Sequence, residues 1–415
     1  AARLASEAQG EQRHARDRVR RCGRRAVDAL VAVIEQGAGC AHGYPDPPLC
    51  EASRRAMENK HLDRARLLAL DELAAIAPVR AVELITPNLP RSGRTVRALL
   101  RKYLARAARR PAGLQAIAAR LEDPALHTLA TVELLRSVVP QIRAIHPQAG
   151  AAFTRMTASE NDLSLRYLLL QPAAALAEIG DGRGMAYVRD RLRNDSEPMV
   201  RTRAAELSRG IEPLQQALMQ ALEDESVRVR DAATRGLTGV PAASMLLVRR
   251  LQVDDWPMVR AAAARALATA ESSSKVDDRL ALALRDPSPT VRTWAATALG
   301  ARGATRFGQT LRALADSPEE KVQVRIAAVR ALGRMCDRGA LELLTVVARR
   351  ARDPYSPEAA SGLGSASVAA LGRIHPSDLR ARLQPLLSGG NNALGRAAAE
   401  TALAETDVCG AGAAQ

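Results

Sequence analysis

The side chains with the most capacity for chemistry in this 415-residue chain are arginines that recur at a regular spacing. Five of them directly follow a valine, at Arg201, Arg230, Arg260, Arg292 and Arg325. The steps between neighbours are 29, 30, 32 and 33 residues. A planar guanidinium can bind a carboxylate or a phosphate through two parallel hydrogen bonds. The series is therefore either a ladder for an anionic ligand or a set of structural ion pairs.

Acidic residues in the preceding turn favour the structural interpretation. Asp195, Asp224, Asp254 and Asp286 each lie five residues before the valine of their unit. We expect each arginine to pair with the turn carboxylate of its own unit or of the adjacent one, because the pattern returns in every unit.

A second basic feature is the segment 91–110, RSGRTVRALLRKYLARAARR, which holds eight basic residues and no acid. On a helix the apolar side chains Val96, Leu99, Leu100, Tyr103 and Leu104 would gather on one side. The other side would carry Arg94, Arg97, Arg101, Lys102, Arg106, Arg109 and Arg110. Such a face could dock an acidic protein, a phosphate backbone or an anionic lipid surface. It could equally be a solvated face whose long stems cover apolar surface.

A third set lies six residues after the repeated valine, at Arg235, Arg265 and Arg330. Trp294 lies three residues after its valine, where other units carry alanine. Tryptophan and arginine are enriched at binding hot spots, which makes these four residues candidates for partner contact. The alternative is that Trp294 fills a wider gap between units.

The remaining reactive side chains do not form a known catalytic or metal-binding pattern. The six histidines, His14, His42, His61, His127, His146 and His375, are scattered. No HExxH, GxGxxG, P-loop or GxSxG motif is present, so we predict no enzymatic activity and no cofactor. The five cysteines include no CxxC pair, which argues against a zinc site. Cys40 and Cys50 bracket a Gly/Pro-rich loop, and they are either a disulfide or two free thiols.

The repeated phrase itself predicts the elements that carry these residues. In VDDWPMVRAAAARAL, Asp and Pro supply helix-start chemistry, and Val259, Ala263 and Leu267 recur at the spacing of one helical face. Apolar segments of about three turns lie between the phrases. Two such helices cannot bury their faces alone, so we expect stacked helical hairpins. The segments are then 1–53 (a helix and the Cys/Pro/Gly loop), 54–180 (degenerate repeats with the basic helix), 181–405 (the repeat array) and 406–415 (a loose tail).

The phrase RDPSPTVRTWAATALG resembles HEAT repeats, specifically the short bacterial HEAT-like type also found in phycobilin lyases. The match is strong over 180–335 and moderate over 54–180 and 336–405. The resemblance implies an all-α, right-handed α-solenoid whose second helices line a concave face. It also implies a scaffold, adaptor or assembly factor.

Composition adds limits to this interpretation. Only 2% of residues are aromatic, which disfavours base stacking, and the net charge of +15 is spread along the chain. No stretch is apolar for the length that spans a bilayer. The chain starts with Ala1 rather than Met, and together with the Cys40–Cys50 loop this favours a periplasmic over a cytoplasmic location. We expect a non-enzymatic scaffold that binds another protein, with a phosphate-binding nucleic-acid protein and a lyase-like accessory factor as alternatives.

Overall fold

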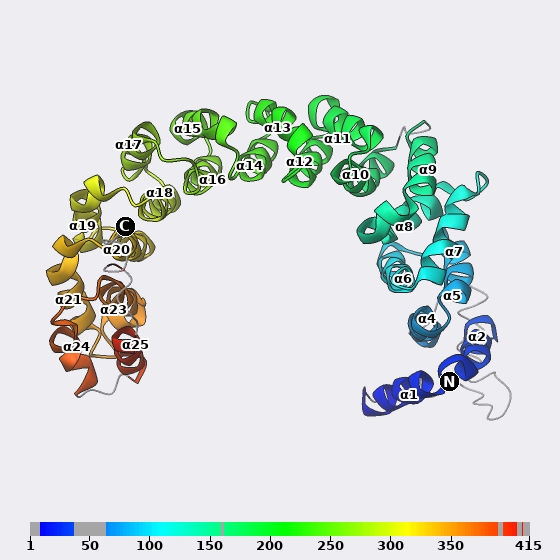
Figure 1. The fold of residues 1–415 in the computed structure, drawn as a ribbon, viewed down its shortest axis with the longest axis horizontal. Helices are drawn as coiled ribbons and strands as arrows, with labels where there is room; N and C mark the ends of the chain where they lie inside the picture. Colours follow the sequence, from blue (N-terminus) through cyan, green and yellow to red (C-terminus); the bar gives the residue numbers. More distant parts are fainter. Residues whose placement is uncertain (1–8, 37–63, 159–161, 389–392, 405–408, 410–415) are drawn as a thin grey trace. The chain divides into compact units, whose positions relative to one another are not determined.

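All the regular secondary structure that the computed structural model describes is helical (Figure 1). The structure describes residues 9–36, 64–158, 162–388 and 393–404, together with Cys409. The chain divides into two compact units, Ala1–Leu207 and Ser208–Gln415.

The first unit contains these helices: α1 (Gln9–Cys22), η2 (Gly23–Ala26), α2 (Val27–Gln36), α4 (Arg64–Ile76), α5 (Pro78–Ile85), η3 (Thr86–Asn88), α6 (Arg94–Ala107), α7 (Pro111–Glu122), α8 (Thr128–Ser137), η4 (Val139–Ile145), α9 (His146–Ala158), α10 (Leu163–Glu178), α11 (Gly182–Asn194) and α12 (Pro198–Leu207). Helices α4, α6, α8, α10 and α12 pack in sequence against one another, and α5, α7 and α9 form a second row beside them. The unit is therefore a stack of helical hairpins in two layers.

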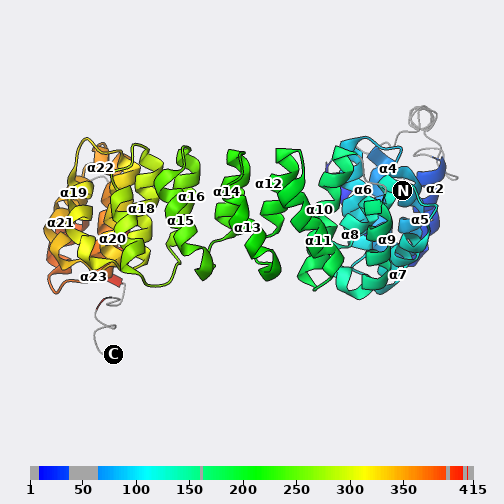
Figure 2. The same ribbon diagram turned by 90° about the horizontal axis from the view of Figure 1, so that it is seen from above.

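The second unit contains these helices: η5 (Glu212–Leu214), α13 (Gln215–Ala221), α14 (Val227–Gly236), η6 (Pro241–Ala243), α15 (Ser244–Val253), α16 (Pro257–Leu267), α17 (Ser274–Ala283), α18 (Pro289–Ala301), η7 (Thr305–Phe307), α19 (Gly308–Asp316), α20 (Val322–Arg334), η8 (Arg338–Ala340), α21 (Leu341–Arg350), α22 (Pro357–Ala360), α23 (Leu363–Ile374), α24 (Leu379–Leu387) and α25 (Ala393–Ala404). The helices that begin with the repeated phrase, α14, α16, α18 and α20, continue with α23 and α25 as one row, which we call the phrase layer. The helices between them, from α13 to α24, form the partner layer. Figure 1 shows the two layers side by side along the unit, and Figure 2 shows the same helices from above.

The apolar stripe of the repeated phrase is the core of this stack. Val259, Ala263 and Leu267 of α16 are all fully buried, and so are the equivalent Val, Ala and Leu of α14, α18 and α20. A helix that buries one stripe gains most of its stability from the neighbour it covers. The helix period predicted from the sequence is therefore confirmed.

Small residues allow neighbouring phrase helices to approach closely. A Cβ atom on Gly300 of α18 would lie 2.6 Å from the Cα of Ala331 on α20, and one on Gly333 would lie 2.9 Å from the Cβ of Ala370 on α23. Real Cβ atoms do not approach this closely, so these positions exclude a side chain. The Ala-rich and aromatic-poor composition is a consequence of this close packing.

The predicted α-solenoid fold is confirmed, whereas the four predicted segment boundaries stay a prediction. Cys40 and Cys50 lie outside the described residues, so the disulfide predicted between them stays a prediction too.

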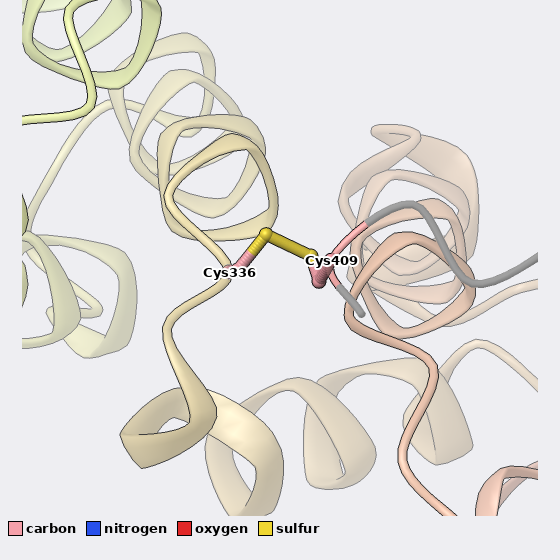
Figure 3. Close-up of a disulfide and its surroundings, with 2 residues drawn as sticks. All are labelled: Cys336 and Cys409. Atoms are coloured by element: carbon pink, nitrogen blue, oxygen red, sulfur yellow. A yellow bond between two sulfur atoms is a disulfide. The ribbon is translucent and has the colours of Figure 1, made fainter. Parts of the chain in front are cut away.

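A disulfide that the sequence did not indicate joins Cys336, just after α20, to Cys409 (Figure 3). Cys336 has a positive φ of 55°, at the position where Gly303 ends α18 with a φ of 64°. The left-handed conformation closes each helix and favours glycine. Cys22 is free and exposed.

Candidate functional site

The repeated arginines join each unit to the next. In the second unit, Arg260 donates from Nε and Nη2 to the carboxylate of Asp286, at 2.8 and 2.9 Å, and from Nη1 to the backbone oxygen of Asp254 at 2.9 Å. One guanidinium thus holds the turn of its own unit and the carboxylate of the following unit. Arg230 binds Asp254 in the same way, with oxygens at 2.8 and 3.1 Å.

The same carboxylates also organise the turn from which the next helix starts. Asp254 accepts from the backbone N–H of Trp256 at 3.0 Å, and Asp286 accepts from that of Ser288 at 2.8 Å. Burial opposes the ionisation of Asp254, but the hydrogen bonds from Arg230 and from the Trp256 N–H outweigh it and hold the pKa of that carboxyl below its ordinary value. These groups are consequently ionised and bound within the fold.

The acceptor that the arginine binds differs between units. Arg292 donates to both oxygens of Glu320, at 2.8 and 2.6 Å, so a glutamate takes the place of the aspartate in that turn. In the first unit Arg166 holds Asp195, with a closest contact of 2.9 Å. Arg325 instead donates to the backbone oxygen of Ala315 at 3.0 Å. The pairing predicted from the acidic turns is therefore confirmed for Arg230, Arg260 and Arg292, whereas a backbone oxygen takes the place of the predicted carboxylate at Arg325.

A second row of arginines stays available on the surface of the phrase layer. A residue six positions after the valine lies about 200° around the helix from the middle of the buried stripe, so Arg235, Arg265 and Arg330 point away from the core. All three are exposed. Among the described residues, Arg235 pairs with Asp231 of its own helix, and its side chain is 55% exposed. Arg330 has no ion-pair partner within the described part of the chain.

Trp294 takes part in this surface. The guanidinium carbon of Arg265 lies over its ring, 4.9 Å from the ring centre, and so joins α16 to α18. Met258, at the start of α16 on the same helix face as Arg265, is 46% exposed. A cation stacked on a half-buried indole, with an exposed methionine two helical turns away on the same face, is a fitting surface for a protein side chain. The four candidate contact residues therefore share the surface of one layer.

The basic segment 91–110 is only partly helical, unlike the exposed arginines of the phrase layer, which all lie within helices. Helix α6 ends at Ala107, so Arg109 and Arg110 lie in the turn before α7 rather than on the predicted helix. The reason is Pro111, because the residue before a proline is disfavoured in the helical conformation, and Arg110 has a φ of −101° and a ψ of 133°. Leu99, expected on the apolar side, is 37% exposed.

Three of the seven basic candidates in this segment are already bound within the protein. Arg97 donates to the backbone oxygen of Ser92 at 2.8 Å, Arg101 to Glu133 on α8 at 2.8 Å, and Arg106 to Asp71 on α4 at 2.6 Å. The other four are exposed and have no such partner among the described residues: Arg94, Lys102, Arg109 and Arg110. The segment is therefore partly a structural clamp and partly a free cationic surface.

One histidine–carboxylate pair forms that the sequence spacing did not suggest. His146 Nε2 lies 2.6 Å from Asp181, which is 35 residues away. Asp181 also accepts from the backbone and side chain of Arg183, where it caps the start of α11. Its carboxylate is thus committed to the helix start, and hydrogen bonds from Arg183 lower its pKa. Within the described ranges, no group of three or more His, Cys, Asp or Glu side chains is placed to hold a metal.

Comparison with known proteins agrees with the geometry. Residues 276–364 match a family model described as HEAT repeats, and residues 211–233 match one described as a HEAT repeat associated with sister chromatid cohesion. The chain carries HEAT-like repeats. No curated protein matches it. Among the helices of its described residues, none is both long and apolar enough to cross a membrane.

Several solved α-solenoids have a similar fold. Yeast importin-β (Kap95p) is 15% identical with a TM-score of 0.55, and Kap95p in a structure with RanGDP is 14% identical with a TM-score of 0.56. The alignments cover 97% of this chain but only 65% and 64% of those proteins, which is less than two thirds of their length. At this identity the likeness concerns the fold.

Proposed function

We propose that the protein is a non-enzymatic scaffold that binds an acidic region of another protein on the surface of its phrase layer. The observation that carries this proposal is that one row of arginines binds turn groups of the fold while a second row stays exposed. One row is bound by carboxylate and backbone oxygens of the fold, whereas Arg235, Arg265 and Arg330 repeat on the exposed face of the same layer.

The spacing of this exposed row suits an extended partner. Arg235, Arg265 and Arg330 come from α14, α16 and α20, so a bound segment would cross successive helices and meet one cation at each of these. Trp294 with Arg265 supplies the flat, partly desolvated contact at which binding energy concentrates. Cations around it supply steering toward an acidic partner.

The relatives support the same class of function. Structures of Kap95p carry RanGDP in one case and Nup1 in another, and both are complexes with protein partners. The finer assignment to short bacterial repeats of the kind found in phycobilin lyases stays a prediction that rests on the repeated phrase.

The test compares two charge-reversed variants of the full chain. The double variant Arg265→Glu/Arg330→Glu removes two exposed cations from the phrase layer. The matched double variant Arg279→Glu/Arg338→Glu changes the net charge equally on exposed arginines of α17 and η8, in the partner layer. Partners are captured by photo-crosslinking from a probe at position 262, a partly exposed residue of α16 three residues before Arg265.

We expect acidic proteins to crosslink to the parent chain and to the partner-layer variant, and to be lost from the phrase-layer variant. Equal loss from both variants would show that net charge rather than this surface governs binding. Crosslinks to nucleic acid in place of protein would support the nucleic-acid alternative and overturn the scaffold proposal.

A further inference from the structure

A pocket in the first unit gathers cations from helices that are far apart in sequence. Its lining comes from α6, the end of α8, η4 and α10, and it includes Arg101, Lys102, Arg136, Ser137 and Gln171. The cavity has a volume of about 240 Å³. One water occupies about 30 Å³ of liquid, so the space holds a small hydrated group rather than a chain of nucleotides.

The charges around this pocket do not cancel. Glu133 on α8 is the carboxylate that both Arg101 and Arg136 reach, at 2.8 and 3.1 Å. Two cations thus share one carboxylate whose side chain is itself only 4% exposed, and a third cation, Lys102, has no anion within the described part of the first unit. An anion in the pocket would compensate this excess of positive charge. The attraction between opposite charges is stronger in a partly desolvated position than in bulk water.

The guanidinium of Arg136 is only partly satisfied by Glu133. Its side chain is 16% exposed, and its Nε is buried without a hydrogen-bond partner, whereas its Nη1 is bound to Glu133. Burial lowers the pKa of Arg136, Glu133 opposes this shift, and the nearby charge of Arg101 adds to it.

We infer that this pocket, formed by Arg101, Lys102, Arg136 and Gln171, is a binding site for a single phosphate monoester. A doubly charged tetrahedral oxyanion offers several acceptor oxygens to guanidinium and ammonium donors that come from two directions, α6 and α8. The chemistry is the same for a small phosphorylated metabolite and for a phosphorylated side chain. The site is independent of the phrase-layer surface, since it belongs to the first unit.

The test measures binding to the full chain at constant ionic strength by isothermal titration calorimetry, with inorganic phosphate and then O-phosphoserine as probes. We expect saturable binding of both near neutral pH, and none of acetate at equal ionic strength. Lys102→Gln removes an exposed cation that has no ion-pair partner among the described residues. It should weaken binding about tenfold, equivalent to about 1.4 kcal/mol, because a unit charge at contact distance from the phosphate is lost. Arg136→Lys retains the charge but loses the planar donor set, and should also weaken binding.

The matched control is Arg94→Gln, which removes an exposed cation from the same helix but outside the pocket lining. Its affinity for phosphate should equal that of the parent chain. Absence of saturable phosphate binding, or equal weakening by Arg94→Gln and Lys102→Gln, would overturn the site. Tighter binding of O-phosphoserine than of inorganic phosphate would indicate a phosphorylated side chain as the source, and the reverse order would indicate a small phosphate; either order upholds the site.

Discussion

The bond between neighbouring repeats at Asp254 gives the most direct test of how this fold is stabilised. The side chains of Asp254 and Arg230 are 1% and 13% exposed, and they share two hydrogen bonds. Replacing Asp254 by Asn removes the negative charge but keeps an acceptor for the Trp256 N–H. The change therefore tests the ion pairs of Asp254, with Arg230 and at 3.6 Å with Arg250, separately from the turn.

The expected cost follows from what Asn cannot replace. One charge-assisted hydrogen bond is lost, and the guanidinium of Arg230 stays mostly buried beside a neutral amide. Breaking a buried pair by removing one partner costs about 3–5 kcal/mol. Since Asn retains one acceptor, we expect about 3 kcal/mol for Asp254→Asn.

The assay is hydrogen–deuterium exchange of the full chain, because repeat arrays open locally and a single melting temperature averages over units. A loss of 3 kcal/mol corresponds to exchange that is roughly 100-fold faster in α14, α15 and α16. Protection in α23 should change far less. The matched control is Asp255→Asn, the exposed neighbour with the same loss of charge.

The reasoning fails if Asp255→Asn accelerates exchange as much as Asp254→Asn does. It also fails if the acceleration is equally large in α23, because the pair would then not act between neighbouring units.

Two further predictions concern the carboxylates of the turns and the disulfide. The pKa values of Asp254, Asp286 and Glu320 lie below their ordinary values, so the stability that these ionised groups contribute is fully present above the ordinary carboxyl pKa of about 4 and is lost as the pH falls through the lowered values. Thermal melts from pH 7 to pH 2.5 should therefore show a steep fall in melting temperature only below about pH 4. The variant Asp254→Asn should show a smaller fall over the same range. Cys409→Ser removes the disulfide, which joins residues 73 positions apart in sequence. The chain-entropy model gives a loss of about 4 kcal/mol in the free energy of unfolding, equivalent to a melting temperature roughly 10 °C lower for the C-terminal helices. The control Cys22→Ser should leave that transition unchanged.

The helical repeat could be predicted from the sequence because it depends on residues that are close together in the chain. A buried stripe at the helical spacing, as in Val259, Ala263 and Leu267, and a turn aspartate before it specify a helix and its start without knowledge of the rest. The role of the repeated arginines followed from the same locality, since an acid accompanies each one in sequence.

The candidate sites were predicted less completely. The exposed row of Arg235, Arg265 and Arg330 could be found from the period alone, because position on a helix fixes which side chains face away from the stripe. For the basic segment the sequence showed the number of cations but not which of them form ion pairs within the protein. Glu133, which binds Arg101, lies 32 residues away on another helix, and no local pattern indicates that distance.

What the sequence determined by itself was therefore the unit: a helix that buries one stripe, a turn that begins it and the arginine that holds the turn. Tertiary structure decided everything that depends on which unit meets which. It placed the carboxylate of the following unit, rather than of the same one, on each arginine from Arg230 to Arg292. It also paired Cys336 with Cys409 and gathered the pocket around Arg136, because those contacts come from stacking, which joins residues that the chain separates.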